Sequence, residues 1–187
     1  MAYIRILLDT NAYLRIGKSI KPLLGIPIGG QKKALYILKQ SQDEFDKVSK
    51  LKSKFAWIQQ EEYTKEKEKI LTTTPGEKVE IERIWDYIWH YQKDEGYSLS
   101  PVDISCIATA LILKIKLVTD DLEMKKTAKI FGVEVIDTIQ LLKILVDEQK
   151  IDLAKVKEIV SYLKYIKDFP HFLNASYKAA FNENPPD

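Results

Sequence analysis

YIRILLDTNAYL, at residues 3–14, is the stretch that decides how the rest of the chain is interpreted. Its apolar first half has the pattern of a strand buried on both faces of a parallel sheet. Asp9 ends this strand, and Thr10 and Asn11 stand at the junction with an apolar helix start. Because ligands of open α/β sheets bind at the carboxyl ends of the strands, Asp9 is a candidate site residue. Helix capping by Asp9 or Asn11 explains this stretch equally well.

Length and composition indicate one α/β domain with an appendage. The chain has 187 residues, and domains commonly span roughly 100–200 residues. Its hydrophobic content of 45% is normal for a globular protein, and no run approaches the roughly 18 apolar residues of a membrane-spanning helix. No secretory leader is visible, and Cys106 is the single cysteine. We therefore expect a cytoplasmic protein without a disulfide and without membrane attachment.

Strand and helix patterns alternate along the chain, which predicts a parallel sheet with right-handed crossovers. The elements predicted after the first helix are a helix at residues 34–51, a strand at 55–58, a helix at 59–70, and strands at 116–119 and 133–136. We expect an α/β domain over residues 1–146, whose sheet has about four or five strands flanked by helices. Residues 147–187 have no strand signal and are predicted to form a C-terminal helical extension, packed on the domain or on a partner.

Ser100 and Pro101 mark the start of one further helix. Serine is a favoured N-cap and proline is favoured at the first helical position. Asp103 completes an S-x-x-D capping box with Ser100. Capping alone therefore explains Asp103, whatever else this residue does.

Acidic residues recur where strands end and helices begin. They are Asp9 after the first strand, Glu61 and Glu62 after the second, Asp103 at a helix start, and Asp120 with Asp121 after a later strand. In a parallel sheet such positions share one edge, where crowded carboxylates repel one another unless a cation neutralises them. No histidine or cysteine accompanies them, so the all-oxygen ligand set favours Mg²⁺ or Mn²⁺ over zinc. Such ions assist in-line displacement at phosphodiesters, which favours a nuclease.

Four motifs of the sequence resemble the PIN-domain ribonucleases, especially toxins of the VapC type. They are LLDTN at residues 7–11, PVDISCIATAL at 101–111, LVTDDLEM at 117–124 and GVEVIDTIQLL at 132–142. The resemblance covers residues 3–14 and about 99–145, and it is weak between them. It implies a single PIN-like domain and a Mg²⁺- or Mn²⁺-dependent endoribonuclease. In such an enzyme, metal-activated water hydrolyses RNA and leaves a 5′-phosphate and a 3′-hydroxyl.

The resemblance also implies roles for individual residues. The catalytic and metal-binding acids would be Asp9, Glu62, Asp103 and Asp121, with Asp120 as an additional or substitute ligand. For the fourth acid of the family, which falls near IQQEEY, we choose Glu62 over Glu61. Asn11 and Thr119 occupy the polar positions that support the site. Three lysines that follow the last acid would meet RNA phosphates, although exposed helix lysines are commonly only solubilising: Lys125, Lys126 and Lys129.

The implied partners are RNA and, as in VapC toxins, a cognate antitoxin and a second copy of the chain in a homodimer. The alternative belongs to another class: a catalytically silent PIN-like binding or assembly module whose acids only cap helices. Two phosphate-handling rivals fit less well. A haloacid-dehalogenase-type phosphatase requires an aspartate where Asn11 stands, and a receiver domain requires its acidic pair after the first strand, whereas Asp120 and Asp121 come far down the chain.

Overall fold

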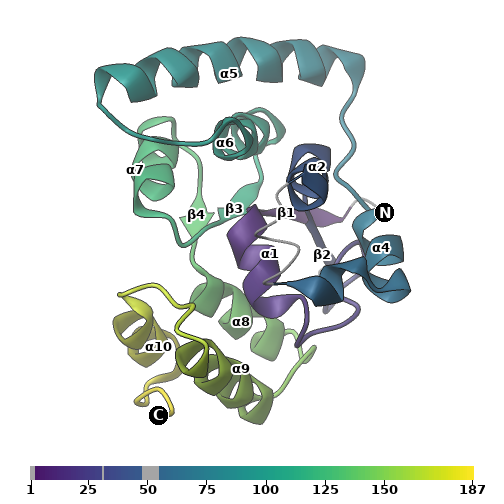
Figure 1. The fold of residues 1–187 in the computed structure, drawn as a ribbon, viewed down its shortest axis with the longest axis vertical. Helices are drawn as coiled ribbons and strands as arrows, with labels where there is room; N and C mark the ends of the chain where they lie inside the picture. Colours follow the sequence, from purple (N-terminus) through teal and green to yellow (C-terminus); the bar gives the residue numbers. More distant parts are fainter. Residues whose placement is uncertain (1–2, 31, 48–54) are drawn as a thin grey trace.

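The computed structural model describes residues 3–30, 32–47 and 55–187, and its centre is a four-stranded parallel sheet (Figure 1). The strands are β1 (Ile4–Leu8), β2 (Lys33–Tyr36), β3 (Lys116–Val118) and β4 (Val135–Ile136), in the spatial order β2-β1-β3-β4. Leu7 of β1 lies opposite both Tyr36 and Leu117. The carboxyl ends of β1, β2 and β3 therefore reach the same edge, and the predicted α/β class with a parallel sheet is confirmed.

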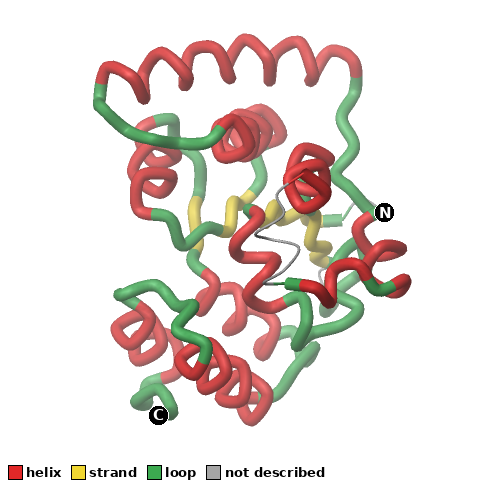
Figure 2. The backbone as a smooth tube through the Cα atoms, in the orientation of Figure 1, coloured by secondary structure: helices red, strands yellow, loops and turns green. Residues whose placement is uncertain are grey.

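Helices cover both faces of this sheet (Figures 1 and 2). Leu8 and Ile6 of β1 belong to one hydrophobic core, whereas Leu7 belongs to the other, as the alternation of side chains along a strand requires. The first core is covered by α1 (Thr10–Ile16), α8 (Thr138–Asp147), α9 (Leu153–Tyr165) and α10 (Leu173–Phe181). The second is covered by α5 (Pro75–Asp94), α6 (Pro101–Leu113) and α7 (Leu122–Ile130), with α2 (Lys39–Lys47) beside α6.

The segment between β1 and α5 differs from the sequence prediction. Residues 34–51 were predicted as one helix, but the structure has β2 followed by α2, and residues 48–51 lie outside the described part. The apolar run ALYIL, residues 34–38, is long enough for a buried strand but also continues a helical spacing, and pairing with β1 selects the strand. Residues 55–58 were predicted as a strand, and the structure has a 3₁₀ turn, η1 (Ala56–Gln59), which leads into α4 (Glu61–Lys67).

The C-terminal helices pack on the same core as the rest of the domain. Ile159 and Leu163 of α9 and Leu173 and Tyr177 of α10 are buried in the core that also contains α1 and α8. Figure 1 accordingly shows α9 and α10 as a further layer next to α8. In the part of the chain that the structure describes, no helix is both long and apolar enough to cross a membrane.

Candidate active site

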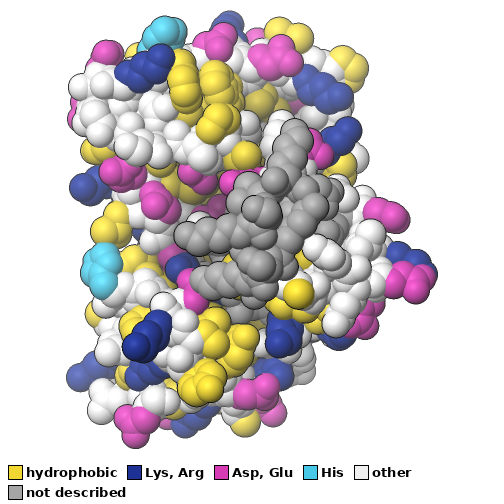
Figure 3. Space-filling model, viewed as in Figure 1, with side chains coloured by type: hydrophobic (Ala, Val, Ile, Leu, Met, Phe, Trp, Pro, Cys, Tyr) yellow, Lys and Arg dark blue, Asp and Glu magenta, His cyan; other side chains and the backbone are white. Residues whose placement is uncertain are grey.

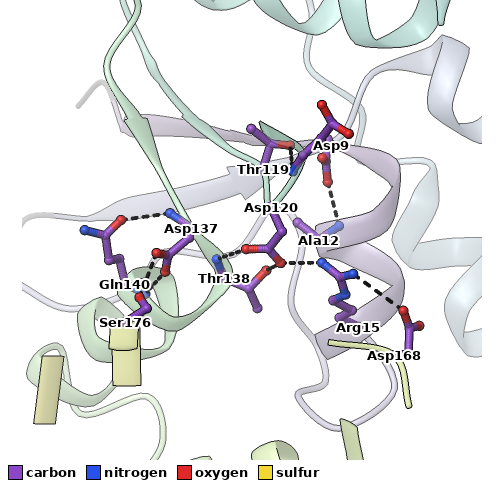
Figure 4. A network of polar contacts seen from close by, with 11 residues as sticks. Asp9, Ala12, Arg15, Thr119, Asp120, Asp137, Thr138, Gln140, Asp168 and Ser176 are labelled. Atoms are coloured by element: carbon purple, nitrogen blue, oxygen red, sulfur yellow. Dashed lines mark hydrogen bonds and ion pairs between the residues drawn. The ribbon is translucent and has the colours of Figure 1, made fainter. Parts of the chain in front are cut away.

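Asp9 lies where β1 passes into α1, and its side chain is buried. The carboxylate is the N-cap of α1 and accepts a hydrogen bond of 2.6 Å from the Ala12 N–H (Figure 4). The pKa of Asp9 is raised to about 7, chiefly by burial and also by the nearby charges of Asp120 and Asp103, although hydrogen bonds from Thr119 and Ala12 oppose the shift. The charges that act most strongly on Asp9 are therefore negative, so its ionised form is disfavoured.

The β3–α7 junction contributes the T-x-D motif. The Thr119 hydroxyl accepts a hydrogen bond of 3.1 Å from the Asp121 N–H and also bonds the Asp9 carboxyl. Asp121 is exposed and caps α7, accepting a bond of 2.7 Å from the Met124 N–H. Thr119 thus contacts both the Asp9 carboxyl and the backbone of Asp121.

Asp103 reaches the same place from the start of α6. The predicted capping box is present in both directions, with Asp103 and Ser100 each bonded to the backbone of the other. Burial raises the pKa of Asp103, and the charge of Asp121 adds to the shift. Asp103 therefore lies within range of the charges of both Asp9 and Asp121.

Glu44 is the acid that sequence reasoning missed. It lies in α2, directly after β2, and its Oε2 accepts a hydrogen bond of 2.8 Å from the Thr10 hydroxyl. The pKa of the buried Cys106 thiol is raised, first by burial and then by three nearby carboxylates. These carboxylates belong to Asp9, Asp103 and Glu44. Glu44 is therefore a helix glutamate after the second strand that reaches the cluster.

Glu62 is not brought to this cluster. It is exposed in the first turn of α4 and forms an ion pair with Lys21, while Glu61 pairs with Lys65 in the same helix. Figure 1 shows α4 at the side of the molecule opposite α7. The prediction of Glu62 depended on a strand at residues 55–58. Because β2 precedes α2 instead, the position after the second strand falls on Glu44.

Asp120 has a different role from its neighbour Asp121. Its Oδ1 accepts a hydrogen bond of 3.0 Å from the Thr138 N–H, and its Oδ2 lies 2.5 Å from both the Thr138 hydroxyl and an Arg15 nitrogen (Figure 4). Arg15 also faces Asp168, at 3.5 Å. These partners occupy both oxygens of Asp120, so its carboxylate joins α1 to α8 rather than offering a free ligand, and Arg15 extends the network to the α9–α10 segment.

A pocket of about 330 Å³ opens beside Asp121. Its walls include Asn11 and Arg15 from α1 and Pro170 and His171 from the segment before α10. Of the three lysines predicted to meet RNA, Lys126 and Lys129 are exposed on α7. Lys125 is partly buried with its ammonium 3.8 Å from the Phe172 ring centre, and burial lowers its pKa.

The donor set of the cluster fits a hard divalent cation in its chemistry. Asp9, Glu44, Asp103 and Asp121 offer only carboxylate oxygens. Burial and neighbouring carboxylates raise the pKa of Asp9, and a cation beside it would offset both effects. Among the described residues, no three acidic, histidine or cysteine side chains stand close enough to hold an ion as they are oriented. All four acids are turned onto their own helix caps or onto Thr10, so binding of an ion would require side-chain rotations.

Comparisons with known proteins identify the family. A crystal structure of FitAcB from Neisseria gonorrhoeae is similar to the chain, with 18% identity and a TM-score of 0.44 over 71% of this chain and 97% of that one. The comparison with curated proteins gave no match. The DUF3368 family model, described as a PIN domain, matches residues 41–169, which is more than half of the chain. The chain therefore belongs to the PIN-domain family, as its motifs predicted.

Proposed function

We propose that the protein is a Mg²⁺- or Mn²⁺-dependent ribonuclease that hydrolyses RNA phosphodiester bonds. Members of the family are generally nucleases. The observation that carries the proposal is the approach of Asp9, Glu44, Asp103 and Asp121 at the carboxyl edge of the sheet, where the pKa of Asp9 is raised to about 7. A group of carboxylates whose negative charges are not neutralised by nearby cations is suited to binding a divalent cation.

Asp9, Asp103 and Asp121 would hold the ion, with Glu44 in place of Glu62 as the fourth acid. A bound divalent ion would supply positive charge for the phosphate and lower the pKa of water. Thr119 holds Asp9 and Asp121 in relation to each other, and the Thr10 hydroxyl orients the Glu44 carboxylate toward the cluster. Glu44 would orient the attacking water. Asn11 lines the neighbouring pocket, where it would contact the RNA.

The test is sequencing of RNA 5′-phosphate ends after expression of the wild type and of Asp103→Asn. Asparagine still caps a helix, so the variant should fold. Asp152→Asn is the matched control, because Asp152 makes the same kind of cap at α9, bonded to the Lys155 N–H. We expect new ends with the wild type and with Asp152→Asn but not with Asp103→Asn, and cleavage by purified protein that stops in EDTA. Full activity of Asp103→Asn would refute the assignment of the site.

The catalytically silent module remains the competing function, because each aspartate of the cluster also caps a helix. A silent module predicts no RNA cleavage by the wild type with either ion. The toxin role, a cognate antitoxin, a homodimer and a cytoplasmic location belong to the proposal through the resemblance to VapC toxins. Co-purification of the tagged protein from its own organism would test the antitoxin and the homodimer together.

A further inference from the structure

The segment YLKYIKDFPH, residues 162–171, carries exposed aromatic side chains between cations. Tyr162, Tyr165 and Phe169 are 39%, 85% and 39% exposed, so three of the large hydrophobic side chains exposed in the described part fall within eight positions. Figure 3 shows hydrophobic side chains between Lys or Arg side chains over the region of α9. We call the following set the aromatic strip: Lys18, Tyr162, Tyr165, Lys167, Phe169 and His171.

The chain turns back on itself at the end of α9, in the middle of the strip. Lys167 takes the left-handed conformation, with φ of 55°, and the Asp168 N–H bonds the Leu163 carbonyl at 3.0 Å, which closes the helix and reverses the chain. Asp168 is the only carboxylate in residues 162–171, and it faces Arg15. Lys18 lies over the Tyr162 ring, 5.7 Å from its centre. The exposed charges of the strip are therefore positive.

Three members of the strip, Lys18, Tyr162 and His171, border the candidate active site or the crevice beside it. Arg15 lines a narrow crevice together with Lys18, Tyr162 and Asp168, and it also lines the larger pocket that contains Asp121. Pro170 and His171 form part of the wall of that pocket. The route from Tyr162 to Asp121 thus runs over residues that border one another.

We propose that the aromatic strip binds single-stranded RNA and leads it to the acidic cluster. This inference rests on the proposed ribonuclease function and adds the surface that binds the substrate outside the acidic cluster. Bases of a single strand stack on exposed aromatic rings without regard to sequence, and the lysines between the rings neutralise phosphates. A duplex hides the faces of its bases, so the rings would contribute little to its binding. The strip gives the C-terminal extension a direct part in substrate binding.

Fluorescence anisotropy with a labelled oligouridylate of about 12 nucleotides, in EDTA to prevent cleavage, tests the strip. The variants are Tyr165→Ala and Lys167→Gln. Tyr165→Phe, which keeps the ring, is one control, and Tyr87→Ala is the other, because Tyr87 is 66% exposed on α5 and lies away from the strip. We expect Tyr165→Ala to weaken single-strand binding about five-fold or more, with both controls within about two-fold of the wild type. Lys167→Gln should reduce the salt dependence of binding.

A duplex of the same length provides the second arm of the experiment. Its affinity should change less than about two-fold in Tyr165→Ala. Wild-type affinity of Tyr165→Ala for the single strand would overturn the proposal, and so would an equal loss for both RNAs. A shift of Tyr165→Ala from dimer to monomer with unchanged RNA affinity would also overturn it and assign the strip to a protein interface. Since binding is measured without metal, absence of cleavage would count against the ribonuclease function and not against the strip.

Discussion

Asp120 and Asp9 are two buried aspartates at the same edge of the sheet, and their negative charges are compensated to different extents. Asp120 has Arg15 and two hydrogen bonds from Thr138 on its oxygens. Asp9 has hydrogen bonds, but the strongest charges acting on it are those of other carboxylates, and its pKa is raised to about 7. The first aspartate thus completes a structural network, whereas the second is held in an unfavourable charge state that a bound cation would relieve.

The largest expected effect on stability comes from removing Arg15, the positively charged partner of Asp120. Arg15→Met should lower the free energy of unfolding by about 3–5 kcal/mol, because it leaves the Asp120 carboxylate buried without its partner. Urea unfolding with an unchanged m value measures this loss. Lys143→Met is the matched control, since the Lys143–Asp147 pair is 38% and 56% exposed and should change stability by less than about 1 kcal/mol. Equal losses in the two variants would show that Asp120 does not depend on Arg15.

Asp9→Asn should change the free energy of unfolding in the opposite direction and stabilise the metal-free protein. The pKa of Asp9 is about 7 in the folded state against an ordinary value of 3.8, so its proton favours folding at low pH and this contribution is lost as pH rises from about 4 to 7. Asparagine keeps the cap and has no charge, so the gain should grow over this range and level off above about pH 7, with an upper bound of about 4 kcal/mol. Thermal unfolding across this range measures the gain, and a variant less stable than the wild type at about pH 8 would contradict it.

Substitutions of Glu44 and Glu62 test by RNA-cleavage activity which of the two glutamates is the fourth acid of the cluster. Glu44→Gln should lower kcat for RNA cleavage about 100-fold, equivalent to about 2.7 kcal/mol, while keeping the bond from Thr10. Glu62→Gln should stay within about two-fold of the wild type, because its partner is Lys21 at the surface. Cleavage assays at saturating Mn²⁺ measure both. A larger loss for Glu62→Gln would restore the residue predicted from sequence.

The smallest effect is expected at the outer lysines. Lys126→Gln should raise KM for RNA about two- to three-fold and leave kcat unchanged, because an exposed lysine supplies one screened phosphate contact. Steady-state kinetics at two salt concentrations give the result. A fall in kcat instead would place Lys126 closer to the reacting phosphate than the structure does.

The well-predicted features are those with a local signal. The strand that ends at Asp9 and the capping box of Ser100 with Asp103 each follow from residues a few positions apart. Glu44 had no such signal. The apolar run of β2 and the pattern of α2 join into one helical spacing, and only pairing with β1 separates them.

The pairing of Arg15 with Asp120 also lay beyond sequence reasoning, because 105 positions separate the two residues. The family resemblance selects Asp121 over Asp120 as a ligand, but no local pattern shows that Asp120 is bound to other residues of the chain. The distinction comes from α1 and α8, whose side chains reach one aspartate and leave the other at the edge of the pocket. Tertiary packing therefore decides which acid of the pair remains available.

Calorimetric titration of Mn²⁺ into the purified wild type, Asp103→Asn and Asp152→Asn tests most directly whether the acidic cluster is a cation site. We predict saturable binding to the wild type and to Asp152→Asn, and an affinity at least about ten-fold weaker for Asp103→Asn, since one charged ligand is lost. Absence of Mn²⁺ binding to the wild type, or equal affinity in all three proteins, would contradict the account.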